Sequence, residues 1–211
     1  MIEHRAHITI ASSEDRFRLG TERLIRQNDP PNAILMFYYR EYGKRSLHNR
    51  NWVKTLCAAQ SIRIDEVEVS FDPVDAWLKY TSTLRSYEFR TNEVVLDFTT
   101  APREAIWTLM YLITRAGVGV SYVYHTPEAY NPDWLSRDPG EPRFMFKMSG
   151  LQDIRKPTIL IVMTGFDPDR TEQLVTFYEP KLTLLGIQTG QQYENTKLNI
   201  ERHERVLNVA P

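Results

Sequence analysis

Short apolar runs alternate along this chain with longer segments whose apolar residues recur at helical spacing. The clearest pair is the apolar run at 93–98, EVVLDF, followed by a segment in which Ile106, Leu109 and Ile113 share one helical face and Gly117 marks the stop. Most other apolar runs have the length of a strand and are bounded by proline, glycine or charge. The pattern predicts strands at 6–12, 32–39, 64–71, 93–98, 118–125, 157–165 and 181–190, and helices at 13–27, 52–60, 72–87, 102–117, 166–178 and 191–209.

This regular alternation of strand and helix predicts the fold class. Strands that are separated by helices form a largely parallel sheet, because each helix carries the chain back across a face of the sheet. We therefore expect an α/β fold, a Rossmann-like three-layer α/β/α arrangement with a mainly parallel sheet of about six to seven strands. Residues 1–211 are expected to form a single domain, with the basic segment 40–51 as a loop.

One segment, at about 126–157, departs from the alternation. It holds five of the twelve prolines together with several aromatic residues, and it has little periodicity. Long segments of this kind in compact domains are commonly functional. It is predicted to be a lid over the sheet edge, an arm that binds a partner, or a segment that packs across the sheet without a chemical role.

Composition narrows the class of protein. The chain is 42% hydrophobic and 25% charged, as globular proteins are, and its 26 basic and 27 acidic residues leave a net charge of −1, which gives no broad attraction for DNA or anionic lipid. These totals leave room for a local basic pocket. Cys57 is the single cysteine, the first residues lack the apolar core of a signal peptide, and the apolar runs are too short to span a bilayer, so we expect a cytoplasmic protein.

Polar residues follow several of the predicted strands, at the point where each strand ends. The carboxyl ends of parallel strands meet at one edge of a sheet, which is where open α/β sheets bind their ligands. Hydroxyls, guanidinium groups and helix amino ends gathered there are suited to holding phosphate or another anion. The candidate ligand-binding residues are Ser12, Arg16, Asp97, Thr99, Thr100, Arg103, Gly165, Asp167, Arg170 and Thr189.

A purely structural interpretation of the same residues stays open. Thr99 or Thr100 would cap the helix that follows, Pro102 would occupy its first turn, and Asp97 would bond to nearby backbone amides. Arg16 and Arg170 would pair with acidic residues of their own helices.

The fingerprints of several enzyme classes are missing. The chain has no G-x-G-x-x-G after its first strand, no G-x-x-x-x-G-K-[ST] and no G-x-S-x-G, so ordinary dinucleotide enzymes, P-loop enzymes and α/β-hydrolases are disfavoured. The five histidines are scattered, and Cys57 lies on a predicted apolar helix face. We therefore expect no metal and no resident cofactor.

The segment VVLDFTTAPREAIWTLMYLI, followed by VGVSYVYH, resembles the core signature of the CRISPR-associated Rossmann-fold (CARF-like) sensor domains. In that signature an apolar strand ends in Asp, a Thr or Ser, a small-residue turn and a Lys or Arg before an amphipathic helix, and Asp97, Thr99 and Arg103 match these positions. TILIVMTGFDPDRTEQLVTF is similar to the opening βα unit of such domains. The match covers about fifty residues, the family's glycine turn is Ala101-Pro102 here, and the opening-like unit lies near the end of the chain.

The resemblance implies binding of a nucleotide or of a cyclic oligonucleotide second messenger, commonly in a homodimer and in bacterial anti-phage defence. The preferred hypothesis is accordingly a Rossmann-like domain that binds a nucleotide-type or other phosphate-bearing ligand and signals to a partner protein. Arg103 would supply charge to the ligand, Thr99 and Thr100 would bond to it, and Asp97 would orient the turn or accept from a ribose hydroxyl.

Two other functions stay open at this point. One is a small hydrolase or glycosidase that acts on nucleotides or nucleic acid, with Asp97 and either Asp167 or His125 as general acid and base. The other is a structural subunit of a protein complex, in which another chain would fill the edge. The sequence favours a binding protein over an enzyme because no nucleophile or catalytic motif stands out.

Overall fold

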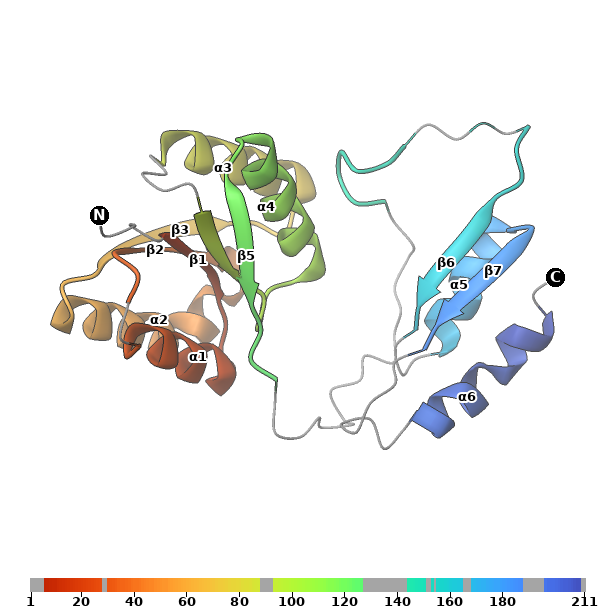
Figure 1. Cartoon of the computed structure of the whole chain (residues 1–211), viewed down its shortest axis with the longest axis horizontal. Coiled ribbons are helices and arrows are strands. Elements are labelled where there is room, and N and C mark those ends of the chain that lie inside the picture. The colour runs from red at the N-terminus through yellow and green to blue at the C-terminus, as the bar shows by residue number, and fades with distance from the viewer. Residues whose placement is uncertain are drawn as a thin grey trace. The chain divides into compact units, whose positions relative to one another are not determined.

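We analysed a computed structural model of the chain (Figure 1). It falls into two compact units, Met1–Glu128 and Ala129–Pro211, and each is described by itself. The structure describes residues 6–27, 30–87, 93–126, 144–150, 153, 155–164, 168–187 and 196–209.

The first unit is built on a five-stranded sheet in which every strand pair is parallel. The strand order is β3-β2-β1-β4-β5, so the first strand lies at the centre and the chain builds outward from it in both directions. The strands are β1 (Ala6–Ala11), β2 (Ala33–Tyr39), β3 (Arg63–Val69), β4 (Glu93–Asp97) and β5 (Gly119–Val123). The helices are α1 (Asp15–Ile25), the short 3₁₀ helix η1 (Arg40–Tyr42), α2 (Gly43–Ala59), α3 (Pro73–Ser86) and α4 (Arg103–Arg115).

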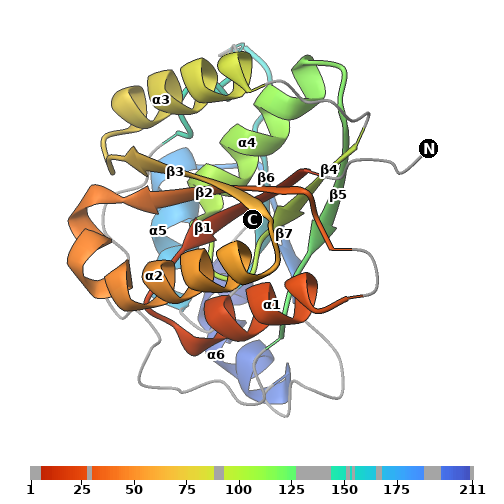
Figure 2. The same cartoon turned by 90° about the vertical axis from the view of Figure 1, so that its left-hand side faces the viewer.

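Helices cover both faces of this sheet, with α3 and α4 on one side and α1 and α2 on the other (Figure 2). The α3–α4 side has the larger apolar core, which includes Ile8, Ile10, Phe37, Leu96, Tyr80, Leu109 and Ile113. The α1–α2 side has a second core, which includes Phe17, Ile25, Ile34, Met36, Val53 and the fully buried Cys57. The central strands are buried on both faces, which is why they are continuous apolar runs in the sequence. The Rossmann-like three-layer prediction is confirmed.

The number of strands in the sheet was overestimated. The prediction placed about six to seven strands in one sheet, whereas the described residues form one sheet of five strands and a separate sheet of two, β6 (Ile159–Met163) and β7 (Leu182–Gly186). Apolar runs at 157–165 and 181–190 identify strands correctly, but an apolar pattern carries no information on which sheet a strand joins.

The end of α4 agrees with the sequence prediction. Gly117 has a φ of +75° and donates its N–H to the carbonyl of Thr114 at 3.0 Å. Glycine adopts this left-handed backbone conformation at little cost, so it ends the helix just before β5.

The prediction of a loop at 40–51 was wrong. A 3₁₀ turn follows β2 directly and α2 begins at Gly43, so the basic residues of this segment are helical. Tertiary partners hold them there, because Asn49 bonds to the backbone beyond β1 and Arg50 pairs with Glu66 of β3. Contacts of this kind override weak local propensity and are invisible in the local pattern.

The second unit contains the parallel pair β6–β7 with α5 (Pro168–Tyr178) and α6 (Thr196–Val209). The hydroxyl of Thr171 and Nε2 of His203 lie 3.1 Å apart and are both buried, which joins α5 to α6. Apolar side chains on one face of the two strands are exposed, namely Ile159, Ile161, Met163, Leu182 and Leu184.

Two sequence predictions stay predictions here. Most of the excursion at 126–157 lies outside the described residues, so its role as lid or arm is open. The division into two compact units does not test the prediction that residues 1–211 form a single domain, which stays a prediction. Among the helices that the structure describes, none combines the length and the apolar character of a membrane span.

Candidate functional site

The centre of the first unit's sheet is a point at which the chain changes direction. β1 lies between β2 and β4, and the helix after β1 covers one face while the helix after β4 covers the other. Ligands of open α/β sheets bind at such a switch point, in the crevice beyond the carboxyl ends of the strands. Six of the predicted site residues lie at the end of these two strands or just after it, namely Ser12, Arg16, Asp97, Thr99, Thr100 and Arg103.

Asp97 is the last residue of β4 and is only 3% exposed. Its Oδ1 accepts the backbone N–H of Thr99 at 2.8 Å, and its Oδ2 accepts the hydroxyl of Thr9 at 3.3 Å. Both carboxylate oxygens therefore have partners inside the protein. This arrangement fixes the turn after β4 and ties it to β1, which matches the orienting role that the sequence suggested.

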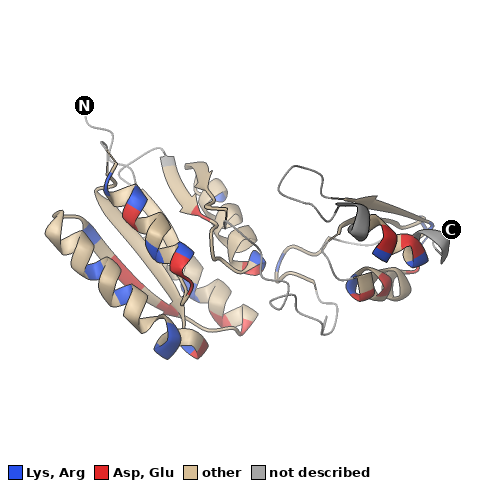
Figure 3. Cartoon of the chain, turned by 90° about the horizontal axis from the view of Figure 1, so that it is seen from below, with Lys and Arg blue, Asp and Glu red and all other residues tan. Residues whose placement is uncertain are grey.

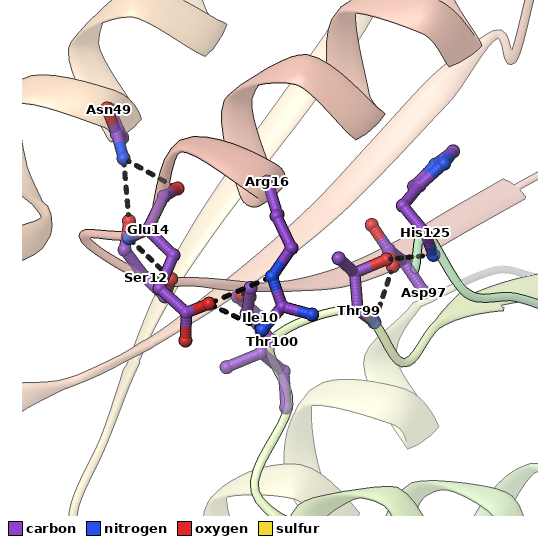
Figure 4. A network of polar contacts seen from close by, with 9 residues as sticks. All are labelled: Ile10, Ser12, Glu14, Arg16, Asn49, Asp97, Thr99, Thr100 and His125. Atoms are coloured by element: carbon purple, nitrogen blue, oxygen red, sulfur yellow. Dashed lines mark hydrogen bonds and ion pairs between the residues drawn. The ribbon is translucent and has the colours of Figure 1, made fainter. Parts of the chain in front are cut away.

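The two threonines after Asp97 join the β4 turn to its neighbours. Thr99 Oγ1 accepts the backbone N–H of His125 at 3.0 Å, beyond β5, and the hydroxyl of Thr100 donates to the carbonyl of Ile10 at 3.1 Å, in β1 (Figure 4). Neither threonine caps α4, so that part of the structural interpretation was wrong. The N-cap position is Pro102, which has no side chain that can accept from the first turn.

The turn after β1 is held in a similar way. Ser12 Oγ accepts the backbone N–H of Glu14 at 2.9 Å, and Asn49 of α2 donates its side-chain amide to the carbonyls of Ser12 at 3.0 Å and Glu14 at 3.2 Å (Figure 4). The turns after β1 and β4 are thus linked to each other, to α2 and to the end of β5. A site built on them is pre-organised before any ligand arrives.

Arg16 lies in the first turn of α1 and makes an ion pair with Glu14, with Nη2 2.6 Å from Oε2. Burial by itself lowers the pKa of the guanidinium, but the hydrogen bond and charge of Glu14, with a contribution from Tyr124, outweigh it and raise that pKa. Arg16 is therefore charged and already neutralised by a neighbour, so its charge is less available to a ligand than that of an unpaired arginine.

The helix amino ends at this edge differ in how they are capped. Asp72 caps α3 by accepting the N–H groups of Val74 and Asp75 at 3.0 and 2.9 Å. The helices α1, α2 and α4 have no side-chain cap. Uncapped helix ends leave backbone donors for water or a ligand. Arg103, the first residue of α4, is exposed and has no ion-pair partner in the described part of the chain.

The structure does not test whether the remaining predicted site residues belong to this group. Arg170 lies in α5 of the second unit, whose placement relative to the first unit is not determined. Gly165, Asp167 and Thr189 lie outside the described residues.

A buried histidine near Asp97 was not among the predicted site residues. His7 of β1 is 1% exposed, and neither of its ring nitrogens has a hydrogen-bond partner among the described residues. Burial is the main cause that lowers the pKa of His7, to about 4. The negative charge of Asp97 raises this pKa and His125 lowers it further, but both effects are smaller than that of burial. A polar residue inside an otherwise apolar strand, AHITIA, is the signal that could have identified it.

Among the residues that the structure describes, no group of three or more His, Cys, Asp or Glu side chains is arranged to hold a metal ion. Besides the carboxylates of Asp97 and Glu14, which have partners within the protein, the polar groups at this edge are hydroxyls, backbone amides and guanidinium groups. Backbone amides at helix amino ends and guanidinium groups bind anions.

Comparison with solved structures gives distant similarities. No family model and no curated protein matches the chain. Among solved structures, Can2 from Sulfobacillus thermosulfidooxidans in complex with cyclic tetra-adenylate aligns at 13% identity and a TM-score of 0.37, covering 57% of this chain. A universal stress protein in complex with cAMP aligns at 13% identity and a TM-score of 0.35, covering 59% of this chain and 99% of its own. The alignment spans about a third of Can2, 32% of its length.

Proposed function

We propose that the first unit binds a nucleotide-type or other phosphate-bearing ligand at the carboxyl edge between β1 and β4. The observation that carries the proposal is the start of α4, where a helix without a side-chain cap begins at Arg103, which is exposed and has no ion-pair partner among the described residues. Backbone N–H groups at a helix amino end and a guanidinium beside them hold phosphate oxygens well, because both place positive charge where the anion sits.

The bonds around Asp97 support the same proposal. They fix the turn that precedes α4 from two sides, through Thr99 and Thr100, so a ligand would meet a site that needs little reorganisation. They also favour a positioning role for Asp97 over acid–base catalysis, since both of its oxygens accept hydrogen bonds from the protein. Binding without turnover is therefore the function that we propose.

Signalling to a partner is the second part of the proposal. We propose that ligand binding changes how this chain associates with itself or with another protein, as expected for a sensor in bacterial anti-phage defence. Size-exclusion chromatography with light scattering, with and without ligand, tests it. An unchanged molar mass for the isolated chain and for the chain with its genomic neighbours would contradict this part and leave ligand binding standing.

The ligand can be tested with a small set of anions. Two solved structures similar to this chain contain cAMP and cyclic tetra-adenylate, so these two are the first probes, with ATP and inorganic phosphate beside them. Isothermal titration calorimetry is run on the whole chain, on Arg103→Ala and on the control Arg115→Ala, which removes an exposed arginine from the other end of α4.

Arg103→Ala is expected to weaken binding by roughly 10- to 100-fold, the value of one charge-assisted hydrogen bond, with little change in Tm. Arg115→Ala should bind like the unaltered protein. Equal affinity in all three would remove Arg103 from the site. Conversion of the nucleotide, followed by chromatography of the reaction mixture, would favour the hydrolase alternative.

A further inference from the structure

The helix α2 is unusual in its charge. This 17-residue helix carries Lys44, Arg45, Arg50 and Lys54 and no acidic residue, in a chain whose net charge is −1. In Figure 3, which shows the unit from the side of α1 and α2, basic residues recur along α2. Positive charge is therefore concentrated locally on this helix, while the chain as a whole attracts no polyanion.

These four cations divide into two pairs. Arg50 and Lys54 point toward the sheet, where both pair with Glu66 of β3. Lys44 and Arg45 are exposed and have no carboxylate partner in the described ranges. The first pair therefore holds the helix in place, and the second pair is left for an external partner.

The position of Lys44 and Arg45 is electrostatically unfavourable in the free protein. They occupy the first turn of α2, at the positive end of the helix dipole, where cations are disfavoured. The other α-helices of the first unit carry an acidic residue in that turn, namely Asp15 in α1, Asp75 in α3 and Glu104 in α4. An anion bound near Lys44 and Arg45 would remove this repulsion.

Aromatic rings accompany the cations along the same face. The guanidinium of Arg45 lies 5.7 Å from the ring centre of Tyr42, which is 47% exposed. About two helical turns further on, the guanidinium of Arg18, from the neighbouring α1, lies 5.7 Å from the ring centre of Trp52. The exposed His48 lies between them on α2. Arg18 also lies 3.8 Å from Asp15, and Trp52 is half-buried against the α1–α2 core, so the exposed Tyr42 is the ring most open to a stacking base. Cations and aromatic rings thus accompany each other along this helix surface.

We propose that the face formed by Lys44, Arg45, His48, Tyr42, Trp52 and Arg18 binds the backbone of a single-stranded nucleic acid without sequence preference. The cations are spaced along the helix rather than gathered at one point, so they suit an extended polyanion better than a single small anion. Cations that follow the phosphates and aromatic side chains that stack on bases are the two elements of such binding. Its amino end, with Lys44 and Arg45, lies at the same carboxyl edge of the sheet as the proposed ligand site, but the surface continues from there along α2 and does not include Arg103 or the turn after β4.

The test uses the whole chain and a fluorescently labelled 20-nucleotide oligo-dT, with anisotropy measured from 50 to 200 mM NaCl. We expect binding that weakens with salt, with a slope of log K against log salt of roughly −2 to −3, as for three or four neutralised phosphates on a single strand. The variant Lys44→Glu/Arg45→Glu should bind at least tenfold more weakly. Its helix should stay folded, because acidic residues suit the first turn.

A matched control is available on the opposite face of the sheet. Lys79→Glu/Arg85→Glu on α3 makes the same change in net charge at two exposed positions. It should keep most of the affinity. Equal loss in both double variants would show that net charge alone decides binding and would overturn the proposal, as would absence of binding at 50 mM NaCl. Poly-glutamate that competes as strongly as the oligonucleotide would assign the surface to an acidic protein instead.

Discussion

The imidazole of His125 fills the space that a side chain at Gly20 would need. A Cβ built on Gly20 would lie 2.4 Å from Cδ2 of His125, well inside contact distance. Gly20 is in the middle of α1, where glycine costs about 1 kcal/mol relative to alanine. The close approach of the ring explains why a residue that weakens the helix is found there, and it ties α1 to the chain beyond β5.

A double-mutant cycle measures this relationship. Gly20→Ala alone should destabilise the protein or leave it unchanged, because the ring of His125 must move. In the His125→Ala background, the same substitution should stabilise it by about 1 kcal/mol, since only helix propensity is left. Urea unfolding of the four proteins gives the coupling. Equal effects of Gly20→Ala in both backgrounds would contradict the contact.

Replacing Asp97 should be costly. Asp97→Ala leaves the N–H of Thr99 and the hydroxyl of Thr9 without their acceptor at a buried position, so the free energy of unfolding should fall by roughly 2–4 kcal/mol. Asp65→Ala is the matched control, because that carboxylate is partly exposed and pairs with Arg63 on the same strand. The control should lose less than about 1 kcal/mol. A comparable loss of unfolding free energy in both variants would show that the two buried hydrogen bonds of Asp97 contribute no special stability.

The buried His7 should make stability depend on pH. Its pKa is lowered from 6.5 in the unfolded chain to about 4 in the folded one, mainly by burial. Above pH 6.5 both states hold it neutral. As the pH falls from 6.5 toward 4, the unfolded chain takes up a proton that the folded chain does not, so about 3 kcal/mol of stability is lost. Below about pH 4 both states are protonated and this loss levels off.

The variant His7→Leu isolates this contribution. It removes two buried ring nitrogens that have no hydrogen-bond partner among the described residues, so it should be at least as stable as the parent at pH 7. Its stability should change less between pH 6.5 and 4 than that of the parent, as measured by urea unfolding at several pH values. Identical pH profiles would mean that His7 is hydrated or protonated in the folded protein.

Removing a helix cap at the sheet edge should change stability without changing ligand affinity, and adding one should do the reverse. Asp72→Ala removes the cap of α3 and should cost about 1 kcal/mol without changing ligand affinity. Pro102→Asp adds a cap to α4 at its N-cap position, where the gain of about 1 kcal/mol is partly offset by the lost rigidity of proline. The added carboxylate should occupy the amides and repel an anion, so calorimetric binding of the ligand should disappear while Tm is kept. Retained binding in Pro102→Asp would place the ligand elsewhere.

The fold could be predicted from sequence to the extent that burial leaves a local pattern. The central strands and α4 are evident because their apolar residues repeat regularly, and the glycine stop at Gly117 has a local cause. The amino half of α2 could not be predicted, since its helical state depends on partners such as Glu66 that lie far away in sequence. Strand order and sheet membership depend on pairing between distant segments in the same way.

The gathering of candidate residues at one edge of the sheet could be predicted, and their hydrogen bonds could not. A strand that ends in Asp97 and is followed by Thr99 and Thr100 places these residues at the carboxyl edge, because the topology brings such strand ends together. The partners of these residues were not evident. Thr100 bonds to Ile10 across 90 positions of sequence, and Thr99 bonds to His125, so neither is free to cap the helix beside it. Asn49 and Glu14 take part only because α2 packs against the turn after β1.

The burial of Cys57 has a practical consequence for labelling. Its side chain is fully buried in the α1–α2 core, and burial raises the pKa of the thiol to about 11, so the thiolate that reacts with maleimides is scarce at neutral pH. The chain has no other cysteine. A cysteine introduced at an exposed position of the first unit, with a second one in α5, would therefore carry donor and acceptor dyes without removal of the native residue. Energy transfer between such dyes would report the distance between the two units directly.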